Sequence, residues 1–375
     1  MFRGLPRKAT ILNTGHRTLK PITWLSPKRK NQHTQILTGW PMELKNQTPF
    51  MAERIALQSR DGRDVLVVMV KGTFRQTAAE QLAPDDEQMP IQMADEYYGG
   101  FSDTSIKYES DIVPFKKNTD VILIGDAYAP GGRATQVDVV LAVGSLRHTV
   151  RVFGDRFWQK GLLAPKISPP LPFEKIPLRY EFAFGGRDLS HEDEARHEQE
   201  PRNPVGLGFR ARRSKRELYD TRLPNLEDPS VLIEKAEDRP APSGFGVLGR
   251  YWQPRATYAG TADEAWMKTR CPLVPEDFDE RYYNGAHPKL VYQGFLGGGE
   301  TVTVLNASEE GRCRFALPAR VPQACLVTTR ENQPVELKMD TLIVEPAEGK
   351  AIVVWRGLAD LHNRLHQIMQ VKVEL

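Results

Sequence analysis

Residues 137–153 read VDVVLAVGSLRHTVRVF, and this stretch decides the fold class. Two runs rich in β-branched residues, 137–143 and 147–153, flank the dipeptide Gly144-Ser145. A Gly-Ser pair between two such runs is typical of a β-hairpin. In the second run, apolar and polar side chains alternate, as they do on the two faces of a strand. The segment therefore predicts two antiparallel strands.

Further short apolar runs have the same character and predict strands at 65–71, 121–125, 301–305, 341–345, 351–355 and 370–375. Residues 346–350 contain Glu348-Gly349 and predict a hairpin loop between the two runs that flank them. Between 357 and 369, leucine and isoleucine recur at a spacing of three or four, which predicts one short C-terminal helix. We expect a mainly β fold with an antiparallel, sandwich-like scaffold.

The middle of the chain, residues 160–300, has a different composition, with 15 prolines and few long apolar runs. Proline cannot donate to a β-ladder and it breaks helices, so loops and short segments are predicted here. Aromatic residues are frequent in the same region, and each ring can bury about 150–250 Å². The middle is therefore expected to be irregular but packed, and rich in proline, glycine and aromatic residues.

The composition excludes several classes of protein. Of 375 residues, 40% are hydrophobic and 26% charged, with a net charge of +3. A nucleic-acid binder is normally more basic, and no stretch of apolar residues is long enough for a membrane-spanning helix. Three cysteines without a C-x-x-C pair provide no zinc knuckle, and they fit a reducing compartment such as the cytoplasm.

Residues 1–41 differ from the remainder because they contain eight Lys or Arg and no Asp or Glu. They lack the unbroken apolar core of a signal peptide. We expect a disordered basic extension or a start codon assigned too early, and a transit-type targeting peptide is the alternative. Residues 42–375 are expected to form a single domain.

Sequence motifs for catalysis or metal binding are incomplete. The sequence HEDEA at 191–195 resembles the zinc-binding motif H-E-x-x-H but lacks its second histidine. The G-x-S-x-G motif that carries the nucleophile of α/β-hydrolases does not occur. Four aspartates, Asp111, Asp120, Asp126 and Asp155, lie at the ends of predicted strands, where aspartate usually accepts hydrogen bonds from backbone amides in turns. Asp155 and Arg156 are expected to pair beneath Trp158. We assign no catalytic, cofactor-binding or metal-binding residue.

The chain contains the following ordered series of motifs: NQTPF (46–50), VKGTF (70–74), SDIVP (110–114), TDV (119–121), GDRFW (154–158), PF (172–173), IPL (176–178), AFGG (183–186), NPVG (203–206), LPN (223–225), WQPR (252–255), GTADEAW (260–266), CPLVPEDF (271–278), YYN (282–284) and WRG (355–357). In this order they resemble the bacterial family called domain of unknown function 2169, over about residues 42–375.

This resemblance implies a role in type VI secretion, as a non-enzymatic chaperone or adaptor in the cytoplasm. Its partners would be a cargo effector and a spike or tip protein, with no nucleic acid and no membrane insertion of its own. Buried aromatic and arginine residues are typical interface anchors, although aromatics at such positions also form cores. The motif residues expected in one role or the other are Asp155, Arg156, Trp158, Phe184, Gly185, Gly186, Asn203, Trp252, Arg255, Trp266, Tyr283 and Asn284.

Two other functions stay open. A carboxylate- or metal-dependent hydrolase would bring Asp111, Asp120, Asp155 and Asp263 around one pocket, whereas an adaptor would leave them in separate turns. A nucleic-acid-associated protein would use the basic residues of 1–41 together with those of 210–216.

Overall fold

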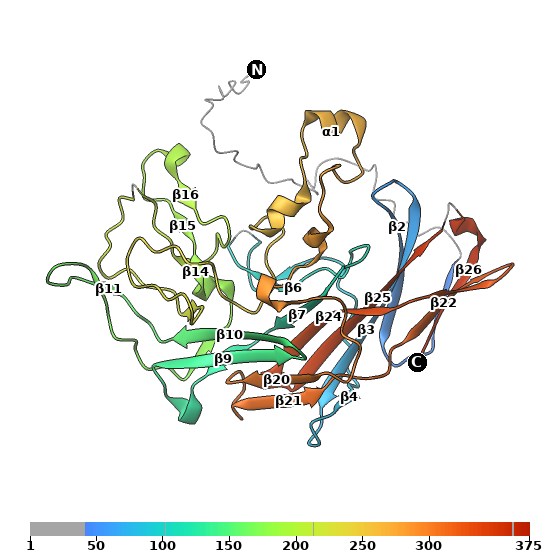
Figure 1. Cartoon of the computed structure of the whole chain (residues 1–375), viewed down its shortest axis with the longest axis horizontal. Coiled ribbons are helices and arrows are strands. Elements are labelled where there is room, and N and C mark those ends of the chain that lie inside the picture. Colours follow the sequence, from blue (N-terminus) through green and yellow to red (C-terminus); the bar gives the residue numbers. More distant parts are fainter. Residues whose placement is uncertain (1–41, 102, 213, 362–363) are drawn as a thin grey trace, which may run out of the picture. The chain divides into compact units, whose positions relative to one another are not determined.

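The structure is a computed structural model that describes residues 42–101, 103–212, 214–361 and 364–375 (Figure 1). The expected basic extension, residues 1–41, lies outside the described residues. The mainly β class is confirmed: strands dominate, and the helix labelled in Figure 1 is the short α1 (Glu264–Thr269). No helix among the described residues is both long and apolar enough to cross a membrane.

The largest sheet has seven strands and brings together segments between residues 51 and 360. Along its main path the order is β19 (Val291–Tyr292), β7 (Thr119–Leu123), β24 (Lys338–Glu345), β25 (Lys350–Asp360), β3 (Asp64–Gln76) and β2 (Met51–Gln58), and β4 (Leu82–Pro84) pairs with β3. All of its pairings are antiparallel except that between β7 and β24. The expected antiparallel scaffold is thus a mixed sheet at this position.

The second sheet has five strands and contains the hairpin predicted from residues 137–153. Its order is β18 (Leu226–Glu227), β10 (Leu146–Phe153), β9 (Gln136–Val143), β20 (Thr301–Leu305) and β21 (Arg312–Ala316). Val143 lies opposite Leu146, so Gly144 and Ser145 form the turn as predicted. All of these pairings are antiparallel.

A third sheet of four strands gathers the N-terminal and C-terminal edges of the described chain. Its order is β1 (Glu43–Asn46), β26 (Ile368–Glu374), β22 (Gln323–Thr328) and β23 (Asn332–Val335). Strand β1 runs parallel to β26, with Glu43 opposite Gln370. This pairing ties the first described residues to the last ones.

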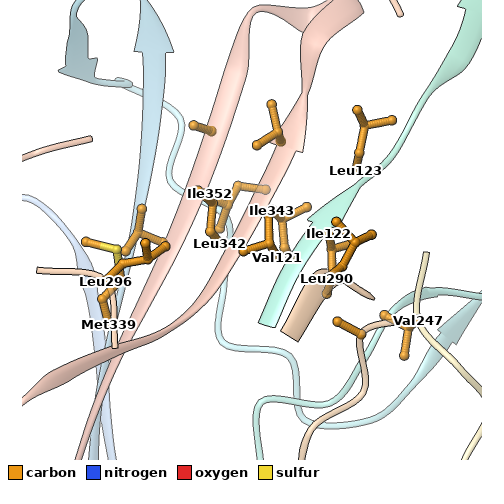
Figure 2. Packing of buried hydrophobic residues seen from close by; sticks show 14 of the residues in the cluster. Val121, Ile122, Leu123, Val247, Leu290, Leu296, Met339, Leu342, Ile343 and Ile352 are labelled. Atoms are coloured by element: carbon orange, nitrogen blue, oxygen red, sulfur yellow. The ribbon is translucent and has the colours of Figure 1, made fainter. Parts of the chain in front are cut away.

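The core lies on the central strands of the large sheet. Every residue of β7 is buried, and β24 is buried from Met339 onward. Figure 2 shows Val121 and Ile122 of β7 beside Ile343 of β24, with Val247 and Leu290 from the irregular middle among the same side chains. Because both faces of these strands are covered, they read as continuous apolar runs instead of alternating ones.

The irregular middle consists of short strand pairs and single helical turns, as expected. The pairs are β8 (Asp126–Tyr128) with β13 (Lys175–Pro177), β11 (Trp158–Gln159) with β12 (Lys166–Ile167), β14 (Phe184–Gly185) with β17 (Leu207–Gly208), and β15 (Arg187–Asp188) with β16 (Glu198–Gln199). Before them, β5 (Glu96–Tyr97) pairs with β6 (Ile106–Tyr108). Turns of 3-10 helix occur at Pro130–Gly132, Tyr180–Phe182, Glu194–Arg196, Arg255–Ala259, Glu280–Tyr283, Pro288–Leu290, Pro346–Glu348 and Leu365–Gln367.

The helical segment expected within 357–369 is much shorter than predicted. Strand β25 continues to Asp360, and among the described residues of this stretch only Leu365–Gln367 forms a helical turn before β26 begins. The reason is pairing with β3, which places Gly357 opposite Val68 and Asp360 opposite Val65. Leu358 is 41% exposed and Ala359 only 4%, so this stretch alternates as a strand despite its helical spacing.

Candidate functional site

The candidate site is a buried ionic network that begins at the start of β7. The Lys116 ammonium lies 2.7 Å from the Asp120 carboxylate, and it also donates a hydrogen bond of 3.0 Å to the Thr341 hydroxyl. Asp120 is fully buried and accepts further hydrogen bonds from the Asn284 side chain, at 3.0 Å, and from the backbone amide of Gly285, at 2.9 Å. The network therefore joins β7, β24 and the loop at 284–286.

A second part of the network lies between β3 and β25. Lys71 pairs with Asp111 at 2.9 Å, and Asp111 also accepts the backbone amide of Gln92 at 2.7 Å. Arg356 donates to the Asp340 carboxylate at 2.5 Å and to the backbone carbonyl of Asp111 at 2.5 Å. The long segment between β3 and β7 is thus held against the sheet through charged side chains.

A third part is centred on Glu109. Arg255, which is 2% exposed, pairs with Glu109 and donates to the backbone carbonyls of Tyr282 and Leu248, each at 2.9 Å. Arg250 lies 3.2 Å from Glu109 and 3.1 Å from Asp95. Arg255 therefore fastens the loops of the irregular middle to the segment that precedes β7.

The electrostatics of the network favour charged forms despite burial. Burial by itself would raise the pKa of Glu109, but Arg255 and Arg250 outweigh it and lower that pKa. Burial would likewise lower the pKa of Lys116, whereas Asp120 and Asp340 raise it above its usual value. Opposite charges at such short range stabilise both ionised partners.

The network is balanced in charge. Five cations, Lys71, Lys116, Arg250, Arg255 and Arg356, face five anions, Asp95, Glu109, Asp111, Asp120 and Asp340. Removing one member of such a set leaves an uncompensated buried charge, which strongly destabilises the folded chain. Chemically, each of these carboxylates is already engaged by a cation, so the arrangement fixes loops on the sheet.

Three of the predicted site residues belong to or adjoin this network. Arg255 and Asn284 are members, as described above. Tyr283 packs its ring against Phe115, with ring centres 5.6 Å apart, and against Phe278, at 5.2 Å. Burial raises the pKa of the Tyr283 hydroxyl to about 12. All three residues therefore have structural contacts in the folded chain.

Asp155 and Arg156 do not pair with each other, contrary to the expectation. Asp155 pairs with Arg222 at 2.6 Å and accepts from the Asn225 side chain at 3.0 Å. Arg156 pairs instead with buried Glu227 and lies over the Phe153 ring. Each of the two side chains is instead engaged by an oppositely charged partner from residues 222–227.

Asn203 and the two glycines before it form a tight loop junction. The Asn203 side chain donates to the backbone carbonyls of Tyr180, at 2.8 Å, and Phe184, at 3.1 Å. A Cβ atom at Gly185 would lie 2.1 Å from the Asn203 carbonyl oxygen, and Gly186 has a φ of +105°. These motif residues are required by the close approach of two backbones.

The predicted tryptophans and Phe184 have different environments. Trp158 and Phe184 share a small buried cluster with Leu223 and Ile233. Trp252 is also buried, and its ring meets that of Tyr180 edge-on, with centres 5.6 Å apart. Trp266 lies in α1 and is only partly buried, and its indole N–H donates to the Leu273 carbonyl at 2.8 Å.

The four aspartates of the hydrolase hypothesis have separate partners. Asp111 and Asp120 are paired with lysines in the network, and Asp155 with Arg222. Asp263 caps α1 by accepting the Trp266 amide at 2.8 Å. Asp111 and Asp120 do accept backbone amides, as predicted, but those of Asp120 come from 165 or more positions away. Among the residues that the structure describes, no three His, Cys, Asp or Glu side chains are grouped as metal ligands.

Sequence reasoning missed most of the network. Lys71, Asp340 and Arg356 escaped notice, although each lies beside or within an apolar β run. A charged residue inside a run that is otherwise buried requires a partner, and that signal could have found them. The partners themselves could not be assigned, because the pairs join residues as distant in sequence as Arg255 and Glu109.

Residues 188–200 form an acidic run, which contacts the basic run at 210–216. The backbone amides of Ala211 and Lys215 donate to the side chains of Asp188 and Ser190, and one exposed ion pair also joins the two runs. Lys215 lies 3.0 Å from Glu192, and both side chains are largely in solvent. Such pairs contribute little to stability. Many of the described side chains in the two runs are exposed, but Asp188 and Glu200, at the two ends of the acidic run, are buried.

Comparison with known proteins gives one match. The family model described as "Uncharacterized protein conserved in bacteria (DUF2169)" matches residues 61–356. No curated protein and no solved structure matches the chain. The matched span includes all ten charged residues of the ionic network, from Lys71 to Arg356.

Proposed function

The chain belongs to the bacterial family domain of unknown function 2169, and on this basis we propose that it is a non-enzymatic chaperone or adaptor of type VI secretion. In this proposal it binds a cargo effector, or a spike or tip protein, in the cytoplasm and helps to load the effector on the spike. One observation carries the proposal: charged side chains of the sequence motifs form buried ion pairs, and these pairs hold the loops on the β scaffold.

A fixed set of loops suits a binding protein. The ionic network fastens Gln92, Asp95, residues 109–120 and parts of 248–286 to the central sheet, so these loops require little ordering when a partner binds. Preorganisation of this kind improves affinity because less conformational entropy is lost on association. Loops carried by a rigid β scaffold are also where binding residues concentrate.

The irregular middle and the segment that precedes β7 expose apolar side chains that a partner could cover. The large exposed ones are Met93, Phe101, Leu162, Leu163, Leu171, Leu189, Val231, Tyr251 and Met267. A chaperone for a toxin has to cover apolar surface of its cargo, and apolar surface of its own is the physical means of doing so. The three cysteines are free thiols, which fits the proposed cytoplasmic location.

The test is co-expression with the candidate partners. The effector and tip proteins encoded beside this chain's own gene are produced with and without it, and soluble yield and co-elution are measured. A true cargo should be more abundant and more soluble in the presence of the adaptor, because binding stabilises it by mass action. If no effector, spike or tip protein co-elutes with the chain, the proposal is refuted.

A further inference from the structure

Two adjacent leucines stand in solvent at the tip of a β-hairpin. Leu162 and Leu163 are 99% and 97% exposed, and they lie in the loop between β11 and β12 (β11 in Figure 1). Single exposed leucines are common on protein surfaces. A consecutive pair with almost no contacts to the rest of the chain is unusual, and exposed apolar patches of this kind mark interaction sites.

The tip is held by a well-packed base. Trp158 of β11 is buried in the cluster with Phe184, Leu223 and Ile233. Its backbone amide donates to the Thr221 carbonyl at 3.0 Å, and its own carbonyl accepts from Asp220 at 2.7 Å. The base of the hairpin is thus fixed on three sides, by its own cluster, by the partner strand and by the segment at 220–221.

The turn itself is tight. A Cβ atom at Gly161 would lie 2.1 Å from the Ala164 carbonyl oxygen, so only glycine fits where the chain reverses. Pro165 follows and fixes its own φ. The two leucines are therefore presented by a preformed loop, which lowers the entropic cost of inserting them into a partner.

Two lysines flank the leucines. Lys160 precedes the turn and Lys166 follows it, and both are exposed. Within the described part of the chain, neither lysine lies within ion-pair distance of a carboxylate. The tip is thus an apolar knob with a positive border, and its complement is an apolar pocket with a negative border.

We propose that the hairpin tip, residues 160–166, inserts Leu162 and Leu163 into an apolar pocket bordered by carboxylates on the cargo protein. This inference rests on the proposed adaptor function and adds the element that contacts the cargo. The leucines supply the apolar contact, and the lysines fix the orientation and accelerate the encounter by charge complementarity.

A lipid surface is a poorer complement to this tip. Two leucine side chains carry fewer methyl and methylene groups than one myristoyl chain, which alone binds membranes only marginally, with a constant of about 10⁴ M⁻¹. Two lysines add little to this, since a stable electrostatic anchor uses a cluster of about four to eight basic residues. A shaped protein pocket gains more from the same two side chains because it also excludes water around them.

The experiment compares three purified variants in complex with the effector or tip protein encoded beside the gene. The tip variant carries Leu162→Ser and Leu163→Ser, and the control carries Met369→Ser and Leu375→Ser, which are also exposed but lie outside the irregular middle. A third variant carries Lys160→Glu and Lys166→Glu. The tip variant should raise Kd at least tenfold, the control should leave Kd unchanged, and the lysine variant should weaken binding mainly at low salt. All three should unfold at the wild-type urea midpoint.

Each other result has a definite meaning. If the tip variant binds cargo as the wild type does, the tip is not the contact and the adaptor function stands. If the wild type binds no such cargo, both proposals are overturned. Flotation of the wild type, but not of the tip variant, with phosphatidylserine vesicles would assign the tip to a lipid surface instead. Tip-dependent dimerisation in sedimentation velocity would assign it to a second copy of the chain.

Discussion

At the scale of single residues, the chain keeps ionised side chains in its interior and satisfies them with one another. Asp120 is the extreme case, because it has no exposure and is engaged by a lysine, an asparagine and two backbone amides. Replacing a buried ion pair as a whole is often tolerated, whereas breaking it is not. The contribution of each member is therefore best seen when it alone is removed.

Asp120→Asn should destabilise the chain strongly, because it leaves the Lys116 ammonium buried without its anion. The expected loss is about 3–5 kcal/mol in the free energy of unfolding, measured by urea denaturation. Glu264→Gln is the control, since the pair it breaks with Lys268 is mostly in solvent and should contribute nothing measurable. An Asp120→Asn protein as stable as the control would show that the pair is dispensable.

His148 and His287 predict that stability falls as the pH is lowered. Their rings stack with centres 4.9 Å apart, near Phe245, Lys289 and Asp228. Burial lowers the pKa of His148 to about 4, helped by Lys289, and that of His287 to about 3, helped by His148. Below about pH 6.5 the two histidines bind protons in the unfolded chain but stay neutral in the folded chain. The free energy of unfolding therefore decreases as the pH falls.

The measurement is the urea midpoint between pH 7 and pH 4.5. The two histidines together should cost the wild type roughly 4–5 kcal/mol of unfolding free energy across this window. The variant His148→Phe, which removes one titrating ring, should show a shallower decline over the same range. If the unfolding free energy of both proteins decreases equally as the pH falls, the histidine pair is not the cause of the pH dependence.

At the scale of elements, the sequence predicts strands where local signals are strong. The turn dipeptide Gly144-Ser145 and the alternating run after it predict the hairpin of β9 and β10, including the residues that form its turn. Leu358 and its neighbours show the limit of such signals: their spacing fits a helix, but pairing with β3 outweighs this local preference. The junction of β7 with β24 is parallel and joins segments more than 200 residues apart, so no local pattern could have revealed it.

Gly357 in β25 tests how closely this strand is packed. A Cβ atom there would lie 2.6 Å from the Glu336 carbonyl oxygen and 2.6 Å from a methyl group of Val335. Gly357→Ala should destabilise the chain by about 1–3 kcal/mol, because the strand cannot move away from its neighbours without disturbing the core.

Thermal or urea unfolding measures this effect, with Gly297→Ala as the matched control. The nearest atom to a Cβ at Gly297 is a flexible glutamate oxygen 3.8 Å away, and no left-handed backbone is required there. The control should unfold as the wild type does. If the Gly357→Ala protein is as stable as this control, there is space beside β25 for a methyl group at position 357.

At the scale of the whole molecule, the candidate site depends on contacts that the sequence could not supply. The motifs included Arg255 and Asn284, which lie in the ionic network, but the partners of these residues come from segments that are distant in sequence. Charged residues in apolar runs were visible in the sequence, whereas their pairing is a property of the folded topology. The sequence therefore indicates which charged residues require a partner, but it does not indicate which partner each one has.

The N-terminal boundary gives a prediction at this scale. A chain that starts at Met42 keeps β1, which pairs with β26 from Glu43 to Asn46, and it should unfold at the same temperature as the full chain. A chain that starts at Gln47 loses this edge strand and should unfold at a lower temperature, because the ladder bonds to β26 are lost. Calorimetry of the three chains measures both effects, and a lowered melting temperature for the chain that starts at Met42 would show that residues 1–41 belong to the fold.

The order of the large sheet has a consequence for synthesis on the ribosome. Strand β3, buried from Val65 to Phe74, takes β25 as a neighbour, yet about 270 residues of chain lie between the two. At roughly 5–20 residues per second, translation leaves β3 without that neighbour for on the order of 15–50 s. During this interval a long apolar edge is open on the nascent chain, and such edges associate with other chains. The central sheet thus acquires β25 long after β3 has been made, and the yield of the protein in the cell should depend on the holdases that protect nascent strands.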